Sequence, residues 1–278
     1  MPTCYIDPVF TTKVVAVDLS NPDAPKIGGS VELKGASWVQ NPQVVGKTLV
    51  LSHYKSVAGK DGQWWGEYYL DRLDVTTATT PKLVDSTNVP GWLVGVAQDG
   101  KSAVTLDWQT QKGSKVEDNK IENVLVAITL GAGKAKIANS LPLPEQVGAT
   151  LRFGDAIYVS TWPYWWNWPT AGKAGEPTVA PESKLLVFDA KDPAKLAQVA
   201  ALNAGAGVSS LHAEGGILFA GVGPGLGLTA WSLATPTQPK FAAFVPTAGY
   251  WSPRVLMQGK TAYLPSGWYG VQSFELTP

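Results

Sequence analysis

One plan recurs along this chain of 278 residues: an apolar strand, a short polar turn that usually contains proline, and a second strand. It is found in "VVAVDLSNPDAPKIGGSVEL" (14–33), "YYLDRLDVTTATTPKLVDSTNV" (68–89), "LLVFDAKDPAKLAQVAAL" (185–202) and "LTAWSLATPTQPKFAAFV" (228–245). The stretch 123–143 is a glycine version, and 270–278 stops after its first strand. Helical periodicity is nearly absent, so the repeats predict an all-β protein.

A second element lies between these units, a hairpin whose turn carries glycine. It is found in "VVGKTLVLS", "AQDGKSAVTL", "RFGDAIYVS", "AEGGILFAG" and "LMQGKTAYLP". When the strands of each unit are named A to D, the hairpin supplies A and B and the proline plan supplies C and D. Four-stranded units recurring every ~40 to 60 residues are typical of propeller blades. The sequence therefore predicts one β-propeller domain over residues 1–278.

The number of blades follows from the C strands, of which the sequence shows six. The first unit lacks a recognisable A strand and the last lacks D, which predicts six blades with the ring closed across the two termini. Five blades, or a ring of up to eight whose missing strands lie outside this chain, remain open alternatives.

The turn and strands of residues 14–31, with "D-x-S-x-P-x-x-P" and "GGSV", resemble the LVIVD-type repeat of bacterial and archaeal secreted or surface propellers. Residues 187–200 and 231–244 resemble it more loosely. The resemblance implies a propeller and an extracellular, cell-surface or periplasmic location, and it carries no catalytic residue. The proline fixes a turn that an Asp or Ser side chain can cap through a hydrogen bond.

Composition excludes several classes of function. Lys plus Arg and Asp plus Glu both number 22, so the net charge is zero and neither nucleic acid nor an anionic membrane is expected as a partner. No apolar run is long enough to insert into a membrane. The single cysteine, Cys4, excludes an internal disulfide, and two histidines, His53 and His212, make a metal site improbable. We expect no cofactor.

The tryptophans are distributed unevenly over the predicted blades. In a propeller the B–C loops and the D–A connections emerge on one face, and eleven of the twelve tryptophans fall in these segments. Trp38, Trp92 and Trp251 are at D–A connections and are expected to pack between blades. The B–C loops, including "STWPYWWNWPT" (160–170), provide the predicted binding residues: Trp64, Trp65, Trp108, Trp162, Tyr164, Trp165, Trp166, Asn167, Trp168 and Trp268.

The predicted function is non-enzymatic: a binding or scaffolding propeller that docks a protein partner or an adjacent domain through this tryptophan-rich face. The alternative is a carbohydrate-binding propeller using the same tryptophans, and a glycoside hydrolase or lyase ranks third. No catalytic residue is predicted, because the carboxylates near the tryptophans, such as Glu67 and Asp107, are typical of solvated loops. Coplanar exposed rings would favour sugar, and an interlocked cluster would favour protein.

Overall fold

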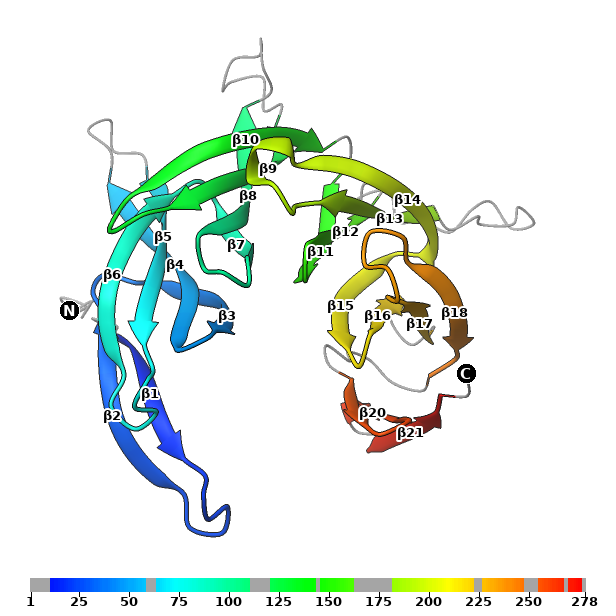
Figure 1. Ribbon diagram of the computed structural model, residues 1–278, viewed down its shortest axis with the longest axis horizontal. Coiled ribbons are helices and arrows are strands. Elements are labelled where there is room, and N and C mark those ends of the chain that lie inside the picture. The colour runs from blue at the N-terminus through cyan, green and yellow to red at the C-terminus, as the bar shows by residue number, and fades with distance from the viewer. Residues whose placement is uncertain are drawn as a thin grey trace, which may run out of the picture. The chain divides into compact units, whose positions relative to one another are not determined.

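The computed structural model describes residues 11–58, 64–110, 121–143, 146–162, 182–222, 227–247, 255–267 and 270–276. Within these ranges the chain is built from β-strands, and the only helix is a single 3₁₀ turn, Pro193–Lys195 (Figure 1). The all-β prediction is confirmed. Over the same ranges, no helix has the length and apolar character needed to cross a membrane.

Contacts divide the chain into two compact units: Met1–Asp107 with Ile128–Ile137, and Trp108–Ala127 with Ala138–Pro278. The first unit contains a two-stranded sheet and a four-stranded sheet, each made of consecutive strands. The two-stranded sheet pairs β1 (Thr12–Asp18) with β2 (Lys26–Leu33). The four-stranded sheet has the order β3 (Trp38–Val45), β4 (Thr48–Ala58), β5 (Trp64–Asp74) and β6 (Lys82–Val89).

The next sheet has the order β7 (Trp92–Val96), β8 (Ser102–Thr110), β9 (Ile121–Leu130) and β10 (Ala135–Leu143). The second unit contains three more sheets. Their strands are β11 (Gln146–Phe153), β12 (Ala156–Trp162), β13 (Glu182–Asp189) and β14 (Ala197–Ala206); β15 (Val208–Glu214), β16 (Ile217–Val222), β17 (Gly227–Ser232) and β18 (Lys240–Val245); and β19 (Leu256–Gln258), β20 (Thr261–Pro265) and β21 (Val271–Glu275).

These sheets match the predicted A to D arrangement. Each four-stranded sheet contains a glycine hairpin followed by the two strands of a proline or glycine unit. In the described residues the first sheet has two strands and the last has three. The repeat therefore identifies the strands and their order within a sheet.

The C–D turns are fixed by aspartate, as the sequence predicts. Asp18, Asp74 and Asp189 each accept a hydrogen bond from the backbone N–H two residues later, at 2.9, 2.8 and 2.9 Å. The bond from the Ser20 backbone, supported by the Ser20 side chain, lowers the pKa of Asp18. The Thr76 side chain, together with its backbone N–H, lowers the pKa of Asp74. The ionised carboxylates thus stabilise the turns.

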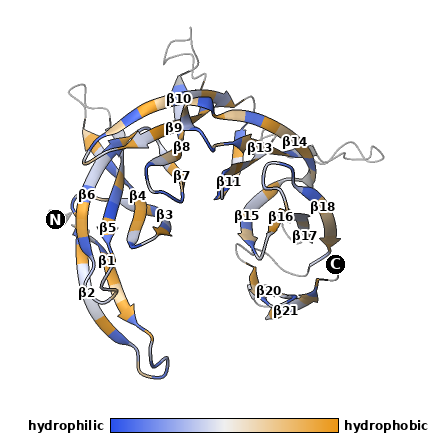
Figure 2. Ribbon diagram, in the orientation of Figure 1, coloured by the Kyte–Doolittle hydropathy of each residue, from blue (hydrophilic) through white to orange (hydrophobic). Residues whose placement is uncertain are grey.

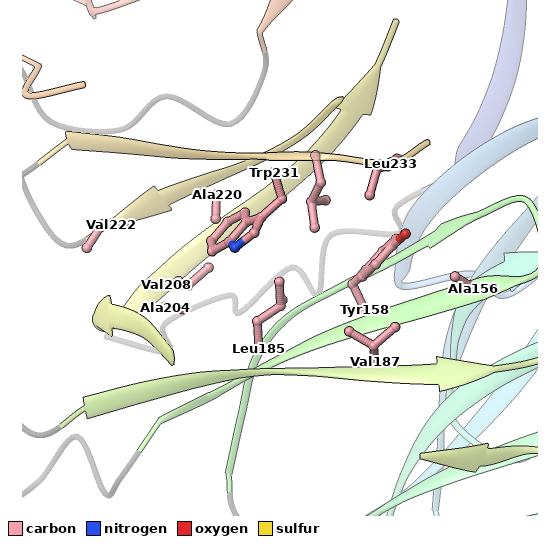
Figure 3. Packing of buried hydrophobic residues seen from close by; sticks show 11 residues of the cluster. Ala156, Tyr158, Leu185, Val187, Ala204, Val208, Ala220, Val222, Trp231 and Leu233 are labelled. Atoms are coloured by element: carbon pink, nitrogen blue, oxygen red, sulfur yellow. The ribbon is translucent and has the colours of Figure 1, made fainter. Parts of the chain in front are cut away.

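The core of the second unit lies between neighbouring sheets. Trp231, on β17, is buried among Leu185, Val208 and Ala220 (Figure 3). Tyr158, on β12, belongs to the same cluster and donates a hydrogen bond from its hydroxyl to the carbonyl of Pro236 at 2.7 Å. Burial raises the pKa of Tyr158, which keeps the hydroxyl protonated as a donor.

In the first unit, β1 and β2 pack against one face of the β3–β6 sheet. Leu33 and Ala36 meet Leu51 and Leu73 in this core. Half-buried and exposed residues alternate along β1, although the middle of this strand is apolar throughout, as its hydrophobic colouring in Figure 2 indicates. Every second residue of β1 therefore points away from this core, and Ile27 on β2 is 80% exposed.

Candidate functional site

The structure describes two of the predicted binding side chains. Trp65 on β5 is 52% exposed and Trp108 on β8 is 53% exposed. Trp64 begins β5 and Trp162 ends β12, but their side chains lie outside the described part of the molecule. Tyr164, Trp165, Trp166, Asn167, Trp168 and Trp268 also lie outside it, so their role stays a prediction.

The β4–β5 hairpin extends beyond its own sheet. Its register is regular from Thr48 opposite Asp74 to Ala58 opposite Trp64, whereas β3 begins opposite Tyr54 and β6 ends opposite Tyr68. Residues 55–58 and 64–67 therefore form a two-stranded arm beyond the sheet. Its outer residues are exposed, including Trp65, so the predicted B–C segment projects as a β-ribbon.

Three partly buried rings gather at the base of this arm, and we call them the aromatic cluster: Tyr54, Tyr68 and Trp92. The Tyr54 centroid is 5.6 Å from Tyr68 and 6.2 Å from Trp92, and Tyr68 and Trp92 are 5.1 Å apart. The rings are tilted by 51°, 36° and 73° to one another, which is typical of interlocked aromatic packing.

Trp92 and Trp38, both at D–A connections, behave differently. Trp92 packs against the neighbouring sheet, as the sequence predicts. Trp38 lies opposite Tyr54 but is 61% exposed, so the prediction that it packs between blades is wrong. Trp38 is the first residue of β3, the edge strand of its sheet, so within that sheet only β4 flanks its indole. It joins the surface beside the aromatic cluster.

Two glycines allow this close packing. A Cβ at Gly66 would lie 2.5 Å from Cε2 of Tyr54, so the Tyr54 ring can cross β5 only because position 66 has no side chain. Gly91 has φ of 66°, and a Cβ there would meet the Leu106 carbonyl and lie 2.6 Å from the Cα of Asp107. Glycine therefore lets the chain approach β8 closely just before Trp92.

Side-chain amides hold β7 against β3. The Asn41 Nδ2 donates to the Leu93 carbonyl at 2.6 Å. Gln43 donates to the Val94 carbonyl at 3.1 Å and accepts from the Val96 N–H at 3.0 Å. Because these bonds satisfy backbone groups that β7 turns toward β3, they fix Trp92 relative to the two tyrosines.

A carboxylate acts on the aromatic cluster. Burial raises the pKa of Tyr68, and the negative charge of Asp107 raises it further. Both effects keep the Tyr68 hydroxyl neutral. Asp107 lies on β8, directly before Trp108. The aromatic cluster thus lies in the field of a negative charge.

The opposite face of the hairpin carries a different set of contacts. The Lys55 Nζ lies 4.3 Å from the centroid of the Tyr69 ring, and the Tyr69 hydroxyl donates to Glu67 at 2.7 Å. The His53 ring stacks on Tyr69 with centroids 5.0 Å apart, and its Nδ1 is hydrogen-bonded to buried Asp71. Through these contacts, Lys55 and Glu67 of the arm are held against Tyr69 of the sheet.

The His53–Asp71 pair is the most deeply buried titratable pair that the structure describes. His53 Nε2 and Asp71 Oδ1 have no hydrogen-bond partner among the described residues. His212 lies 3.3 Å from Glu214, whose carboxylate also accepts from the backbone N–H of Met257. In the described part of the chain no three His, Cys, Asp or Glu side chains gather in a way that could hold a metal ion.

No protein-family model and no curated protein sequence matches the chain. Among solved structures, it is similar to a hypothetical selenium-binding protein from Sulfolobus tokodaii, with a TM-score of 0.56, 12% identity, and coverage of 91% of this chain and 64% of that one. It is also similar to a functionally unknown protein from Desulfotomaculum acetoxidans, with a TM-score of 0.50, 12% identity, and coverage of 86% and 65%.

These likenesses concern the fold alone, because both identities are 12%. The chain spans 64% and 65% of the lengths of the two similar proteins. The class defined so far is therefore an all-β protein of repeated antiparallel sheets, compatible with a propeller.

Proposed function

We propose that this protein is a non-enzymatic binding module that docks a protein partner through the aromatic cluster and the exposed Trp38 beside it, with the exposed Trp65 on the other face of the arm as a second anchor. The supporting observation is the tilted arrangement of Tyr54, Tyr68 and Trp92. A sugar ring stacks best on a flat and accessible ring face, whereas an interlocked cluster with an exposed indole beside it provides anchors for the side chains of a protein partner.

The energetics of protein interfaces support this proposal. Tryptophan and tyrosine are enriched among residues that contribute most to binding, since they bury large areas with few rotatable bonds. Trp38 and Trp65 are each more than half exposed, so burying them against a partner would remove considerable apolar surface from water. The hydrogen bonds between His53 and Asp71 and between Asn41 and the Leu93 carbonyl hold the surface in place before binding, which lowers the entropic cost of association.

The test is affinity capture from proteins of the source organism, with the same material applied to a glycan array. The double variant Trp38→Ala/Trp65→Ala removes the two exposed anchors. Phe241→Ala, on β18, is the matched control, since Phe241 is also an exposed aromatic residue. We expect the double variant to lose its partner and the control to keep it. A partner kept by both variants contradicts the proposal, and glycan binding lost in the double variant favours the carbohydrate alternative.

We also propose that the sheets are blades of one six-bladed propeller closed across the termini. The two-stranded first sheet and three-stranded last sheet support closure, because each lacks strands that a blade requires. Exposed apolar side chains support it as well, Ile27 on β2 and Val271 on β21 among them. Deleting residues 1–33 should unfold or oligomerise the protein. A stable monomeric deletion variant would contradict closure.

The resemblance of residues 14–31 to the LVIVD-type repeat supports a secreted or surface location for this module. Fractionation of the source cells tests this part of the proposal. Recovery of the protein in the cytosol would contradict it.

A further inference from the structure

We infer that the free edges of the sheets are built to prevent the pairing of a further strand, so that copies of the protein do not associate through their backbones. These edges belong to the D strands β2, β6, β10, β14 and β18, each of which is the last strand of its sheet. A free edge can pair with a strand of another molecule, above all where it is apolar. Each D strand carries an exposed, large apolar side chain: Ile27, Val84, Ile137, Val199 and Phe241. The edges therefore need protection, and three features provide it.

The first feature is a β-bulge near the start of the D strand. In β6, Leu83 and Asp85 pair with consecutive residues of β5, which leaves Val84 as an extra residue. Three other D strands have an extra residue at the equivalent place: one of Gly28 and Gly29 in β2, Val199 in β14 and Ala242 in β18. A bulge increases the local twist and interrupts the regular series of hydrogen-bonding groups, so a straight strand pairs poorly along it.

The second feature is the Pro-Lys pair with which three D strands begin. A proline directly precedes β2, β6 and β18, and an exposed lysine is the first residue of each: Pro25 and Lys26, Pro81 and Lys82, and Pro239 and Lys240. Proline has no N–H to donate to an added strand. When two such edges meet, their lysines bring like charges together, which opposes pairing.

The third feature is a hydrogen bond to the C–D turn of the next sheet along the chain. In β2, β6 and β10 it is made by the residue three positions after the lysine near the start of the strand. The bonds run from the Gly29 N–H to the Thr79 carbonyl, from the Gly133 N–H to Asp85, and from the Asn139 side-chain amide to the Leu196 carbonyl, at 2.6, 3.1 and 3.1 Å. Each bond lies within one compact unit. The neighbouring turn thus covers part of the free edge, as loops do at protected edges.

The experiment first removes the charge from the edges. The triple variant Lys26→Thr/Lys82→Thr/Lys240→Thr replaces the three edge lysines with a residue that favours strands. The control variant Lys47→Thr/Lys101→Thr/Lys260→Thr lowers the net charge equally, at exposed lysines that follow glycine in the A–B hairpins. Self-association is measured by sedimentation velocity over a concentration series. We expect the association constant of the edge variant to be about fivefold higher than that of the control, the effect of one unfavourable cross-strand charge pair.

A second pair of variants tests the bulge. Deleting Val84 lets β6 pair with β5 in a regular register, so we expect this variant to self-associate severalfold more strongly than the wild type. Val84→Ala is the matched control, because it removes the apolar side chain but keeps the extra residue, and it should behave as the wild type does. Near-ultraviolet circular dichroism checks that the variants are folded. If the deletion variant does not fold, the lysine variants decide the question on their own.

Amide hydrogen exchange, followed by mass spectrometry, identifies the contact. A strand added to β6 would protect N–H groups of residues 82–86, so their exchange should slow severalfold as the edge variant associates. Equal self-association of the edge and control variants, or association without slower exchange in the D strands, would overturn the inference. All these variants keep Trp38 and Trp65, so capture of the partner should be unchanged, and the proposed docking is judged separately by the Trp38→Ala/Trp65→Ala variant.

Discussion

Replacing Gly91 with alanine is expected to be among the most damaging small substitutions in the first unit. Gly91 has φ of 66°, a conformation that costs an L-residue about 1 kcal/mol. In addition, the new Cβ would meet the Leu106 carbonyl and lie 2.6 Å from the Cα of Asp107. Both neighbours are backbone atoms of β8, so the clash can be relieved only by moving the strand, at a cost of roughly 1–3 kcal/mol. The expected total is about 2–4 kcal/mol.

Gly46 provides the matched control. Its φ of 59° is nearly the same, but a Cβ there would meet nothing within 4 Å. Gly46→Ala should therefore lose only the conformational part, about 1 kcal/mol. The free energy of unfolding of both variants is measured by urea titration followed by tryptophan fluorescence. If the two variants lose equal stability, the close approach at Gly91 has no energetic importance and our account of how Trp92 is positioned is wrong.

Three further predictions concern other contacts. The pKa values of Asp18 and Asp74 are lowered in the folded state, so the ionised carboxylates stabilise the fold above about pH 4, and this stabilisation is lost as the pH falls through the lowered pKa values. Replacing both residues with asparagine should therefore flatten the acid limb of a curve of unfolding free energy against pH. Tyr158→Phe removes one hydrogen bond and should lower the free energy of unfolding in urea by about 1 kcal/mol. Asn41→Ala should cost roughly 1–3 kcal/mol in the same assay and shift the Trp92 indole signal in NMR spectra, since it frees a buried carbonyl of β7; an unshifted signal would show that Asn41 does not position Trp92.

The strands and turns were predictable because their signals are local. In the β3–β6 sheet, the glycine hairpin and the turn at Asp74 are each encoded within a few residues, and the structure has both where the repeat predicts them. The prediction that Trp92 packs against a neighbouring sheet is also confirmed. A D–A connection runs from one sheet to the next, so a residue within it lies near both sheets. Such features depend on residues close together in the chain.

The aromatic cluster was not predicted, although one signal for it exists. In the sequence, Tyr54 and Tyr68 are equally far from Asp61, so a hairpin centred on that residue would place them opposite each other. This is the observed register of the two tyrosines. The distribution of tryptophans does not reveal this pair of tyrosines. A tyrosine within a strand fits the usual strand pattern, so nothing in the local sequence marks it as part of a cluster. Which side chain meets Trp92 also depends on the register shift between Gln40 and Gln43 and on the bonds to β7, and neither is encoded by local periodicity.

The two faces of the hairpin explain why binding is proposed on one of them. On the face of Tyr69, the ring is covered by His53 and Lys55 and its hydroxyl is bonded to Glu67, so its polar and aromatic groups are largely satisfied within the chain. On the face of Tyr54, the rings contact mainly each other, with the exposed Trp38 indole beside them. Trp65 lies on the face of Tyr69, because it alternates with Gly66 along β5. A partner gains most free energy by covering apolar surface that the protein itself leaves accessible. The face of Tyr54 is therefore the better binding surface. The buried His53–Asp71 bond supports that face from the opposite side of the sheet, because it joins β4 and β5, which carry Tyr54 and Tyr68.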